Sequence, residues 1–410
     1  MTEPAAASRD EPLLAGITVV DFTRVLAGPY ATRMLADLGA RVIKIERPGE
    51  GDEIRHTVLQ LDPKRTDQSS YFARLNAGKE SIAIDLGHPQ VRDVVLNLVR
   101  SADVVVENFS PGVMTRYGLD AATLLALRPE LVYCSISGFG QSGPMRSTQA
   151  YAHLINAISG IMDLERSGEA TPRVSYLMTA DVLAGTHAFG AICAALLRRG
   201  RNGRGSYLDV SMLECLIAAD DLSYAALLNG GKLAREPRIG MLVHPIGERY
   251  LAMQSSGAPH MWPRVVALIG RPELENDPRF ATVMARRTNW AALVEILRER
   301  LDQFDSVDQA VETLSAARIP AAPVLSPEEV IELPQLAARS AFPQIPHQGR
   351  GHIRVTALPI HVDRKPVAPG GPAPYRVGQH TRKILGEFGY DAGQIQALQS
   401  QGVVEIPGET

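Results

Sequence analysis

The feature that most constrains the fold is a series of short apolar segments, rich in valine and isoleucine, in the first third of the chain. Amphipathic segments with helical spacing separate several of them, at 28–40, 88–101 and 120–129. Buried strands that alternate with helices are typical of parallel βαβ units. The sequence therefore predicts an α/β fold with an open, Rossmann-like parallel sheet and helices on both faces. The expected strands are 16–22 (GITVVDF), 41–48, 81–86, 102–109 and 130–140.

This topology also predicts where a ligand would bind. In open parallel sheets, ligands bind beyond the carboxyl ends of the strands. We therefore expect the binding residues to lie where the predicted strands end. Those segments are 22–30, 46–48, 85–88, 108–112 and 137–144.

The pattern of segments changes after about residue 230. A strand candidate at 247–254 is followed by helical segments and by the proline-rich stretch IPAAPVLSPEEV. This change predicts a smaller α+β domain. We expect residues 12–215 to form the first part of the large domain, 216–330 the small domain with its connectors, and 331–405 the return to the large domain.

Composition narrows the class of protein. The chain has 410 residues, is 45% hydrophobic, and carries a net charge of −3, which argues against a nucleic-acid partner. Its three cysteines, Cys134, Cys193 and Cys215, lie far apart, as expected for reduced thiols in the cytoplasm. The polar N-terminus does not resemble a signal peptide. The sequence has no long, uninterrupted apolar run, so we expect no membrane partner.

Several common catalytic motifs are absent from the sequence. The turn after the first predicted strand, TRVLAGPYA, lacks the G-x-G-x-x-G pattern of dinucleotide-binding proteins. There is no G-x-x-x-x-G-K-[ST] phosphate loop and no G-x-S-x-G nucleophile motif. Without H-E-x-x-H or a tight Cys/His cluster, we expect no metal site.

One carboxylate stands apart from this background. Asp181 begins a long apolar stretch, and no other acid occurs between Glu169 and Asp209. An aspartate in this position is favoured as a helix N-cap. A helix N-terminus would also stabilise the anion in apolar surroundings that otherwise raise its pKa, and an ionised carboxylate can attack an activated acyl group. The residues alone leave both interpretations open.

Long motifs in a fixed order identify a family resemblance. The stretch LAGITVVDFTRVLAGPYATRMLADLGARVIKIERPGEGDEIR resembles the opening of the class III coenzyme A transferases. The resemblance continues through LNAGKESIAIDL, ADVVVENFSPGVMTRYGL, SISGFGQSGP, GRGSYLDVSMLE and DPRFATVMARRTN. This family includes formyl-CoA and carnitine-CoA transferases and the related α-methylacyl-CoA racemases.

The resemblance implies a function in acyl-CoA metabolism, with Asp181 as the catalytic residue. Asp181 would attack an acyl-CoA thioester, and CoA would pass to a carboxylic acid through aspartyl anhydride and thioester intermediates. CoA would be a substrate, no cofactor would be bound permanently, and the chain would form an interlocked homodimer. The positions that match CoA contacts are Leu26, Ala27, Arg47, Ile84, Asp85, Asn108, Phe109, Ser110, Arg116, Gln149 and Tyr151.

Three departures from the family pattern argue against a formyl-CoA:oxalate pair of substrates. Leu26 replaces a glutamine of the formyl enzymes, and Ala152 replaces a catalytic acid. The segment 241–254 looks shortened where those enzymes carry a glycine-rich lid.

Two alternatives remain open at this stage. A racemase needs an acid and a base on opposite sides of the α-carbon, and family racemases have Gly-His-Asp where this chain has Ala150-Tyr151-Ala152. We expect the nearby His153 to point elsewhere and to be structural. A non-catalytic CoA-binding homologue is the second alternative, because the acid at Ala152 is missing.

Overall fold

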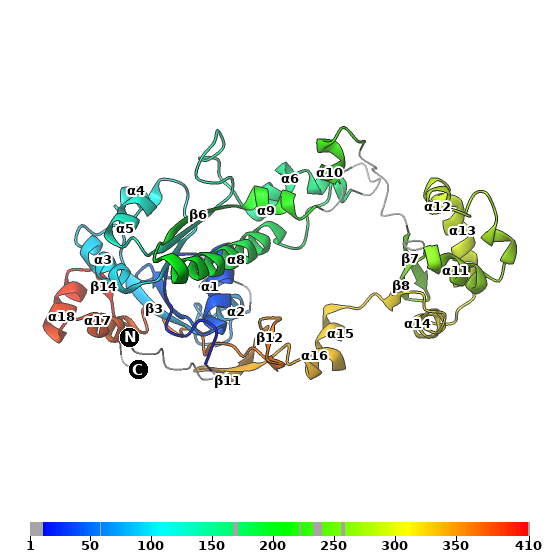
Figure 1. The fold of residues 1–410 in the computed structure, drawn as a ribbon. Coiled ribbons are helices and arrows are strands. Elements are labelled where there is room, and N and C mark those ends of the chain that lie inside the picture. The colour runs from blue at the N-terminus through cyan, green and yellow to red at the C-terminus, as the bar shows by residue number, and fades with distance from the viewer. Residues whose placement is uncertain are drawn as a thin grey trace, which may run out of the picture. The chain divides into compact units, whose positions relative to one another are not determined.

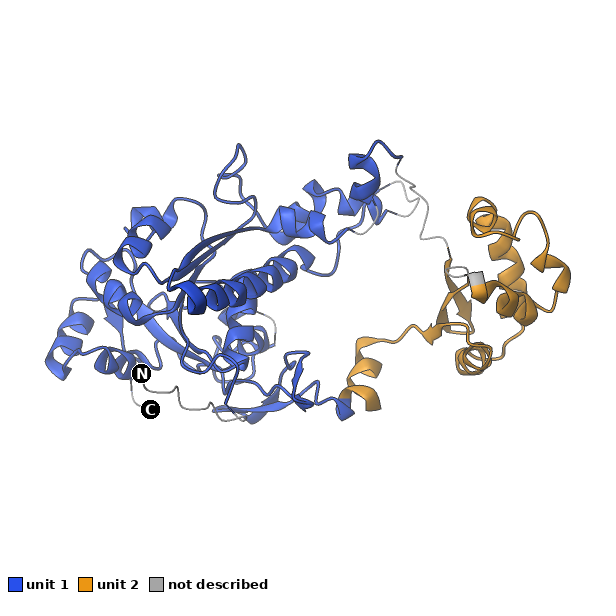
Figure 2. Ribbon diagram, viewed as in Figure 1, with its two compact units in different colours: residues 1–166, 171–233, 337–410 blue, residues 167–170, 234–336 orange. Residues whose placement is uncertain are grey.

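The computed structural model describes residues 11–57, 59–166, 171–220, 223–232, 240–255 and 259–408. These residues form two compact units, shown in Figure 2. Unit 1 contains residues 1–166, 171–233 and 337–410, and unit 2 contains 167–170 and 234–336. Residues 216–220 and 223–232, which the sequence placed with the small domain, belong to unit 1, where helix α9 (Met212–Ala218) packs on helix α8 (Thr179–Asn202).

Unit 1 is built on a seven-stranded sheet with the order β14-β3-β2-β1-β4-β5-β6 (Figure 1). The pairs from β3 to β6 are parallel, and β14 is antiparallel to β3. The order 3-2-1-4-5-6 is that of a Rossmann sheet, which confirms the predicted fold class. The strands are β1 (Thr18–Asp21), β2 (Arg41–Glu46), β3 (Lys79–Ile84), β4 (Val104–Glu107), β5 (Val132–Ser137), β6 (Ser206–Ser211) and β14 (Val404–Glu405).

Alternation along the strands produces one apolar core on each face of this sheet. Val20 and Val105 contribute to one core, whereas Val19 and Val104 contribute to the other. The first core contains residues of α3 (Val91–Ser101), α5 (Ala121–Leu127), α17 (Thr381–Glu387) and α18 (Ala392–Ser400). The second contains residues of α1 (Ala27–Asp37), α6 (Ala152–Ile158), α8 and α9. Nearly continuous valine and isoleucine therefore reflects strands that are covered on both sides.

The C-terminal segment returns to unit 1, with α17 and α18 against the first core and β14 at the edge of the sheet. The sequence predicted this return to the large domain but not the short strand. Two antiparallel hairpins precede it, formed by β10 (Gln344–His347) with β11 (Gly351–Arg354) and by β12 (His361–Val362) with β13 (Lys365–Pro366). The remaining elements of unit 1 are η1 (Glu53–His56), α2 (Ser70–Asn76), α4 (Val113–Arg116), α7 (Ile161–Leu164), α10 (Ser223–Leu228) and, at the edge, part of α16 (Pro334–Ala338).

Unit 2 is an α+β body with its own apolar core. Its antiparallel sheet has the order β7-β8-β9. Both tryptophans of the chain belong to this unit: Trp262 is buried in the core, and Trp290 is partly buried and packs against it. The elements are β7 (Met241–Ile246), β8 (Arg249–Gln254), η2 (Pro259–Met261), α11 (Trp262–Ile269), η3 (Pro272–Glu275), α12 (Val283–Thr288), α13 (Trp290–Leu301), α14 (Val307–Ala316), β9 (Ala321–Pro323) and α15 (Pro327–Ile331).

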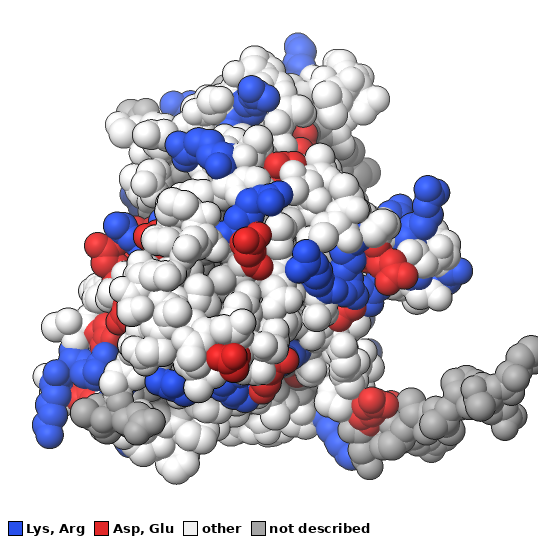
Figure 3. All heavy atoms as spheres, turned by 90° about the vertical axis from the view of Figure 1, so that its left-hand side faces the viewer, with Lys and Arg blue, Asp and Glu red and all other residues white. Residues whose placement is uncertain are grey.

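Helix α8 is the one element among the described residues that is long and apolar enough to cross a membrane. It also contacts α1, α9, β5 and β6, so one side of it belongs to the core of unit 1. Only a third of its most apolar stretch is buried, which leaves an apolar side uncovered. On the face in Figure 3, basic and acidic side chains are interspersed, in line with the net charge of −3.

Candidate functional site

A pocket of about 780 Å³ opens where the order of the sheet reverses, beyond the carboxyl ends of β1 and β4. Its walls come from the segments that follow four adjacent strands, including Phe22–Arg24 after β1 and Asp85–Gly87 after β3. A reversal of strand order leaves a crevice because the two neighbouring connections run to opposite faces of the sheet. Four of the five strand-end segments that the sequence nominated thus contribute to one cavity, whereas 137–144 contributes Gln141 to a separate pocket.

Four of the predicted CoA-binding residues line this pocket: Arg47, Ile84, Asp85 and Phe109. The side chain of Arg47 is 74% exposed and pairs with Glu50 at 3.0 Å, so its guanidinium is accessible to an anionic ligand. Ile84 closes β3 and is buried, whereas Asp85 is partly exposed.

Three others lie elsewhere. The amide of Asn108 is bonded to the backbone of Arg24, Ser110 lines a separate pocket of about 390 Å³, and Arg116 is exposed at the end of α4. Its neighbour Tyr117 lines the larger pocket.

That pocket has contributors that the sequence analysis did not single out. Arg24 lines it with its guanidinium 5.3 Å from the centre of the Phe109 ring, and Lys44, Asp52 and His56 also contribute. Arg24, Lys44 and Asp52 lie within the long family motif, but no contact with CoA was assigned to them from the resemblance.

Asp181 is the third residue of α8, so it is not the N-cap that one interpretation of the sequence required. The cap position is Met178, and no side chain caps this helix end. Because Asp181 sits inside the first turn, its carboxylate is free of the capping function and is stabilised by the positive end of the helix.

The environment of Asp181 raises its pKa from the ordinary aspartate value to about 6. Desolvation by burial is the largest cause. Backbone hydrogen bonding from Ala27 and from Asp181 itself lowers the pKa, and the charge of His153 lowers it further. The sequence argument named both influences, burial that raises the pKa and helix-end N–H groups that lower it, and burial is the larger. At pH 7 the carboxylate is nevertheless about 90% ionised.

Two helix N-termini therefore meet at this carboxylate, since Ala27 is the first residue of α1 and Asp181 lies in the first turn of α8. The two helices approach closely at Gly185 of α8, which has no side chain. An added side-chain carbon there would lie only 2.5 Å from the carbonyl oxygen of Ala27. Neither Leu26 nor Ala27 has a polar side chain, so the backbone supplies the contact. An anion between two helix N-termini is stabilised by both.

Apolar and aromatic groups surround the carboxylate. Leu26 is buried in a cluster that Tyr71 and Val182 adjoin. Burial and the charge of Asp181 raise the pKa of Tyr71, on α2, to about 12, so the phenol remains protonated. Exclusion of water from such surroundings strengthens the electrostatic interactions of the carboxylate.

His153 was expected to point elsewhere and to be structural. His153 is the second residue of α6, a helix that packs on α8, and its charge acts on Asp181. Its Nδ1 atom is buried without a hydrogen-bond partner among the described residues. Ala152, at the start of the same helix, is buried, whereas the predicted contacts Gln149 and Tyr151 are exposed.

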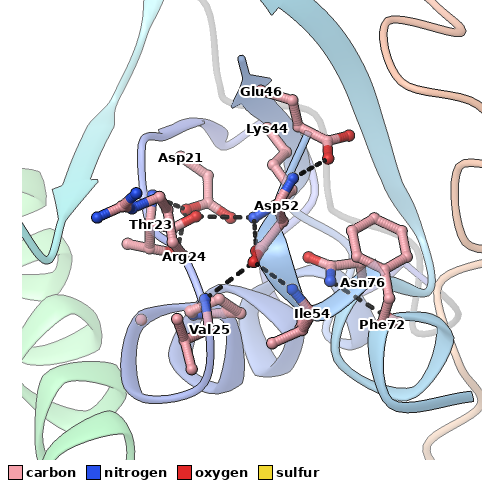
Figure 4. Close-up of polar contacts among 12 residues, drawn as sticks. Asp21, Thr23, Arg24, Val25, Lys44, Glu46, Asp52, Ile54, Phe72 and Asn76 are labelled. Atoms are coloured by element: carbon pink, nitrogen blue, oxygen red, sulfur yellow. Dashed lines mark hydrogen bonds and ion pairs between the residues drawn. The ribbon is translucent and has the colours of Figure 1, made fainter. Parts of the chain in front are cut away.

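Beneath the pocket lies a network of buried charges, part of which Figure 4 shows. Lys44 pairs with Asp52 at 2.9 Å, Arg55 pairs with Glu46 at 2.7 Å, and Lys79 pairs with Asp21 at 3.1 Å. All six side chains are at most 1% exposed. Within the described residues, no cluster of His, Cys, Asp and Glu is arranged to hold a metal ion.

Comparison with known proteins relates this site to one family. Residues 14–381 match CoA-transferase family III. The acetyl-CoA:oxalate CoA-transferase of Acetobacter aceti is 38% identical over 83% of this chain and 87% of its own length. The succinyl-CoA:glutarate CoA-transferase of Mus musculus is 33% identical over 96% of this chain and 90% of its own. The crystal structure of a CAIB/BAIF family protein from Brucella suis superimposes with a TM-score of 0.79 at 32% identity, covering 92% of this chain and 100% of that one.

The chain therefore belongs to CoA-transferase family III, as its sequence motifs predicted. The Rossmann sheet, its pocket at the reversal of strand order, and a carboxylate at two helix ends are features of one domain of this family member.

Proposed function

We propose that this protein transfers CoA from an acyl-CoA thioester to a carboxylic acid, and that Asp181 is its nucleophile. Family membership supports the reaction type, and relatives along nearly the whole chain are named as CoA-transferases between acyl-CoA and acid. The observation that carries the assignment of Asp181 is its place between two helix N-termini, with a pKa of about 6.

Different parts of the acyl-CoA substrate would bind at the pocket and at Asp181. The nucleotide part of CoA would occupy the 780 Å³ pocket, with Arg47 and Arg24 near its phosphates and Phe109 beside its base. The turn from Thr23 to Ala27 runs from that pocket to Asp181, which is the direction the pantetheine arm would follow. CoA is thus a substrate, and we assign the enzyme no permanently bound cofactor.

Each step of the proposed reaction exchanges one acyl bond for another. A carboxylate oxygen of Asp181 attacks the thioester carbon, the carbon–sulfur bond breaks, and CoA leaves as a thiolate with the electron pair. The thiolate then attacks the carbonyl carbon of Asp181 in the anhydride, releasing the donor acid and forming an aspartyl-CoA thioester. The acceptor carboxylate then attacks the aspartyl-CoA thioester, which releases the CoA thiolate and forms a second anhydride. The thiolate attacks the acceptor's carbonyl carbon in this anhydride, which gives the new acyl-CoA and regenerates Asp181 without consuming water or a proton.

Water would compete with the acceptor acid because it hydrolyses an anhydride. The apolar cluster of Leu26, Tyr71 and Val182 beside the nucleophile reduces its access. The missing acid at Ala152 does not remove a group from these steps, since none of them needs a proton donor. His153 supplies the additional charge beside Asp181.

We propose a homodimer as the cover for the apolar surface around α6, α8 and α10. Large apolar side chains are exposed there, among them Tyr176 at 96% and Leu228 at 81%. Contiguous exposed apolar surface marks association sites. Sedimentation velocity tests this: wild type should sediment as a dimer, and Leu228→Glu combined with Ile158→Glu should dissociate it, whereas a wild-type monomer would contradict the proposal.

We place the enzyme in the cytoplasm, where its three free cysteines would stay reduced.

A substrate panel tests the activity. Acetyl-CoA, succinyl-CoA and formyl-CoA serve as donors, and oxalate, glutarate and succinate as acceptors, with product CoA esters separated by chromatography. Hydroxylamine added during turnover should trap a hydroxamate at Asp181, detected by peptide mass spectrometry. Asp181→Ala should lower the rate of transfer at least about 10³-fold.

Three results would overturn the assignment. Full activity of Asp181→Ala would exclude this residue as nucleophile. Deuterium from solvent entering the α-carbon of an α-methylacyl-CoA, with no CoA exchange, would instead identify a racemase. Binding of CoA without exchange across the panel would identify a non-catalytic homologue.

A further inference from the structure

The turn that leads to Asp181 contains a residue in an unfavourable backbone conformation. Val25 has a φ of +65°, in the left-handed region. A β-branched residue rarely adopts this conformation, because its side chain crowds the backbone. Such strain costs about 1–3 kcal/mol and persists only where the surrounding structure holds it.

Two side chains hold this turn from opposite sides. The amide of Asn108, after β4, makes two hydrogen bonds to the backbone of Arg24: the Arg24 N–H donates to Asn108 Oδ1 at 2.8 Å, and Asn108 Nδ2 donates to the Arg24 carbonyl at 2.8 Å. From the loop after β2, Asp52 Oδ1 accepts from the Val25 N–H at 3.2 Å (Figure 4).

A buried lysine fixes this arrangement to the sheet. Lys44 Nζ donates to the carbonyl of Thr23 at 2.7 Å and to Asp52 Oδ2 at 2.9 Å. Lys44 and Asp52 are each about 1% exposed in their side chains, so water does not compete with these bonds. Gly28, at the start of α1, is packed so closely that an added side-chain carbon would lie 2.3 Å from the side chain of Thr23.

The turn ends at Ala27, whose backbone hydrogen bonding acts on the Asp181 carboxylate. Rotation about Val25 into an ordinary conformation would redirect the start of α1. The strained residue lies two positions before Ala27, so the conformation of the turn has a consequence at the proposed nucleophile, Asp181.

We propose that Asn108 and Asp52 are positioning residues for catalysis, because they hold Val25 in its left-handed conformation and thereby keep the Ala27 N–H directed at Asp181. This inference rests on the proposed function of Asp181. It assigns Asn108 a position on the turn rather than the CoA contact that the family resemblance implied.

The carboxylate of Asp181 is also faced by Tyr71 from α2 and by His153 from α6. Among the described residues, neither Tyr71 nor His153 makes a hydrogen bond to the turn that would replace the Ala27 N–H. Loss of that N–H leaves desolvation, the larger influence on the pKa, less opposed. The pKa of Asp181 would then rise above 6, and less of the enzyme would be ionised at a given pH.

Asn108→Ala is the direct test, because Asn108 is only partly buried and its loss leaves the buried Lys44–Asp52 pair intact. The measurement is single-turnover release of CoA thiol from succinyl-CoA between pH 5 and 8. We expect the acid limb of the rate to move upward by about 0.5 to 1 pH unit, which lowers the rate about two- to fivefold at pH 6. The KM for succinyl-CoA should change less than the rate.

Two further variants distinguish positioning from folding. Asn97→Ala is the matched control, since Asn97 is partly buried and bonds the carbonyl of Phe388 at 2.8 Å, away from the turn. It should leave the acid limb where wild type has it. Adding Val25→Gly to Asn108→Ala removes the strain, because glycine adopts positive φ freely, and should move the limb back toward pH 6.

The outcomes are separable. An Asn108→Ala variant with a raised KM and an unmoved acid limb would make Asn108 a CoA contact and overturn the inference. Failure of Val25→Gly to recover the limb, or a shift in Asn97→Ala equal to that in Asn108→Ala, would overturn it as well. If the proposed function itself fails, Asp181→Ala keeps the thiol-release activity, a result that none of these variants can imitate.

Discussion

Two buried carboxylates in unit 1 have opposite pKa shifts, although burial is the largest influence on both. Glu46, at the end of β2, has its pKa lowered to about 2, whereas Asp181, in the first turn of α8, has its pKa raised to about 6. Around Glu46 the guanidinium of Arg55 donates two hydrogen bonds, at 2.8 and 2.7 Å, and Ser81 donates a third at 2.6 Å. Asp181 has backbone amides and an imidazole instead.

The contrast shows that the partners of a buried carboxylate decide its chemistry. A full cation with two parallel hydrogen bonds more than offsets desolvation, and the resulting anion is too stable to be a useful nucleophile. Amide dipoles offset desolvation only in part, which leaves an anion that is ionised at neutral pH but still reactive. Glu46 supports the pocket, and Asp181 is suited to react.

The largest expected effect comes from removing the cation beside Glu46. Arg55→Met would leave the buried carboxylate without its main partner and should lower the free energy of unfolding by about 3–5 kcal/mol. Urea denaturation measures this loss. Circular dichroism is the suitable signal, because both tryptophans lie in unit 2 and their fluorescence would not report on unit 1. Stability from Glu46 is present above its unfolded pKa of 4.5 and is lost in the wild type as pH falls toward 2, so the difference in stability between wild type and variant should narrow in acid.

Lys383→Met is the control for that experiment, because Lys383 pairs with Glu80 but is 57% exposed. Its loss should change the free energy of unfolding by less than about 1 kcal/mol. Equal losses of unfolding free energy in the two variants would mean that burial does not make the Arg55–Glu46 pair more stabilising than the Lys383–Glu80 pair.

The second prediction concerns the opposite carboxylate. Asp181→Asn should raise the free energy of unfolding by about 1–3 kcal/mol at pH 7.5, because an ionised Asp181 is costlier in the folded protein than in the unfolded chain. With a folded pKa of about 6 above the model value of 3.8, this cost grows as pH rises from 4 to 6. Thermal midpoints should differ at pH 7.5 and converge near pH 4; a less stable variant at pH 7.5 would contradict the raised pKa.

The third prediction is the pH dependence of acylation. Single-turnover release of thiol from acetyl-CoA, whose acyl group does not titrate, should fall about tenfold per pH unit below pH 6 and level off above it. Ser81→Ala acts on Glu46 and should leave this limb in place. A limb near pH 4 would show that Asp181 has an ordinary carboxylate pKa.

The smallest effect is expected at His153, the last of the influences on Asp181. His153→Gln removes a charge that lowers the pKa of the carboxylate, so the acid limb should move upward by less than one pH unit. The rate at pH 6 should fall about two- to threefold. A downward movement of the limb would reverse the sign of the interaction.

Local sequence patterns were sufficient for the secondary structure that forms the pocket. Valine-rich strands and the helices between them predicted the sheet, and strand ends such as 85–88 line the cavity. Boundaries moved by a few residues; the strand predicted at 81–86 occupies Lys79–Ile84, because its polar first residues, Lys79 and Glu80, pair with β2 and Lys79 is buried. Hydrophobicity alone does not mark residues that are buried through hydrogen bonds.

The environment of the candidate site was less accessible to such reasoning. Asp181 was found because it is isolated in an apolar stretch, but its place in the first turn and its raised pKa depend on α1 and α6. The orientation of His153 depends on how α6 packs on α8, which no periodicity specifies. Likewise, the amide of Asn108 meets Arg24 from 84 residues away.

The sequence by itself determined most of the strands and helices, the family and the carboxylate that we propose as nucleophile, because these follow from local apolar patterns and from contiguous motifs. The tertiary structure decided how that carboxylate behaves. A pKa is set by burial and by every charge and dipole nearby, and those groups come from α1, α2 and α6. Only folding brings them together, and it also places a strained valine where Asn108 and Asp52 can hold it.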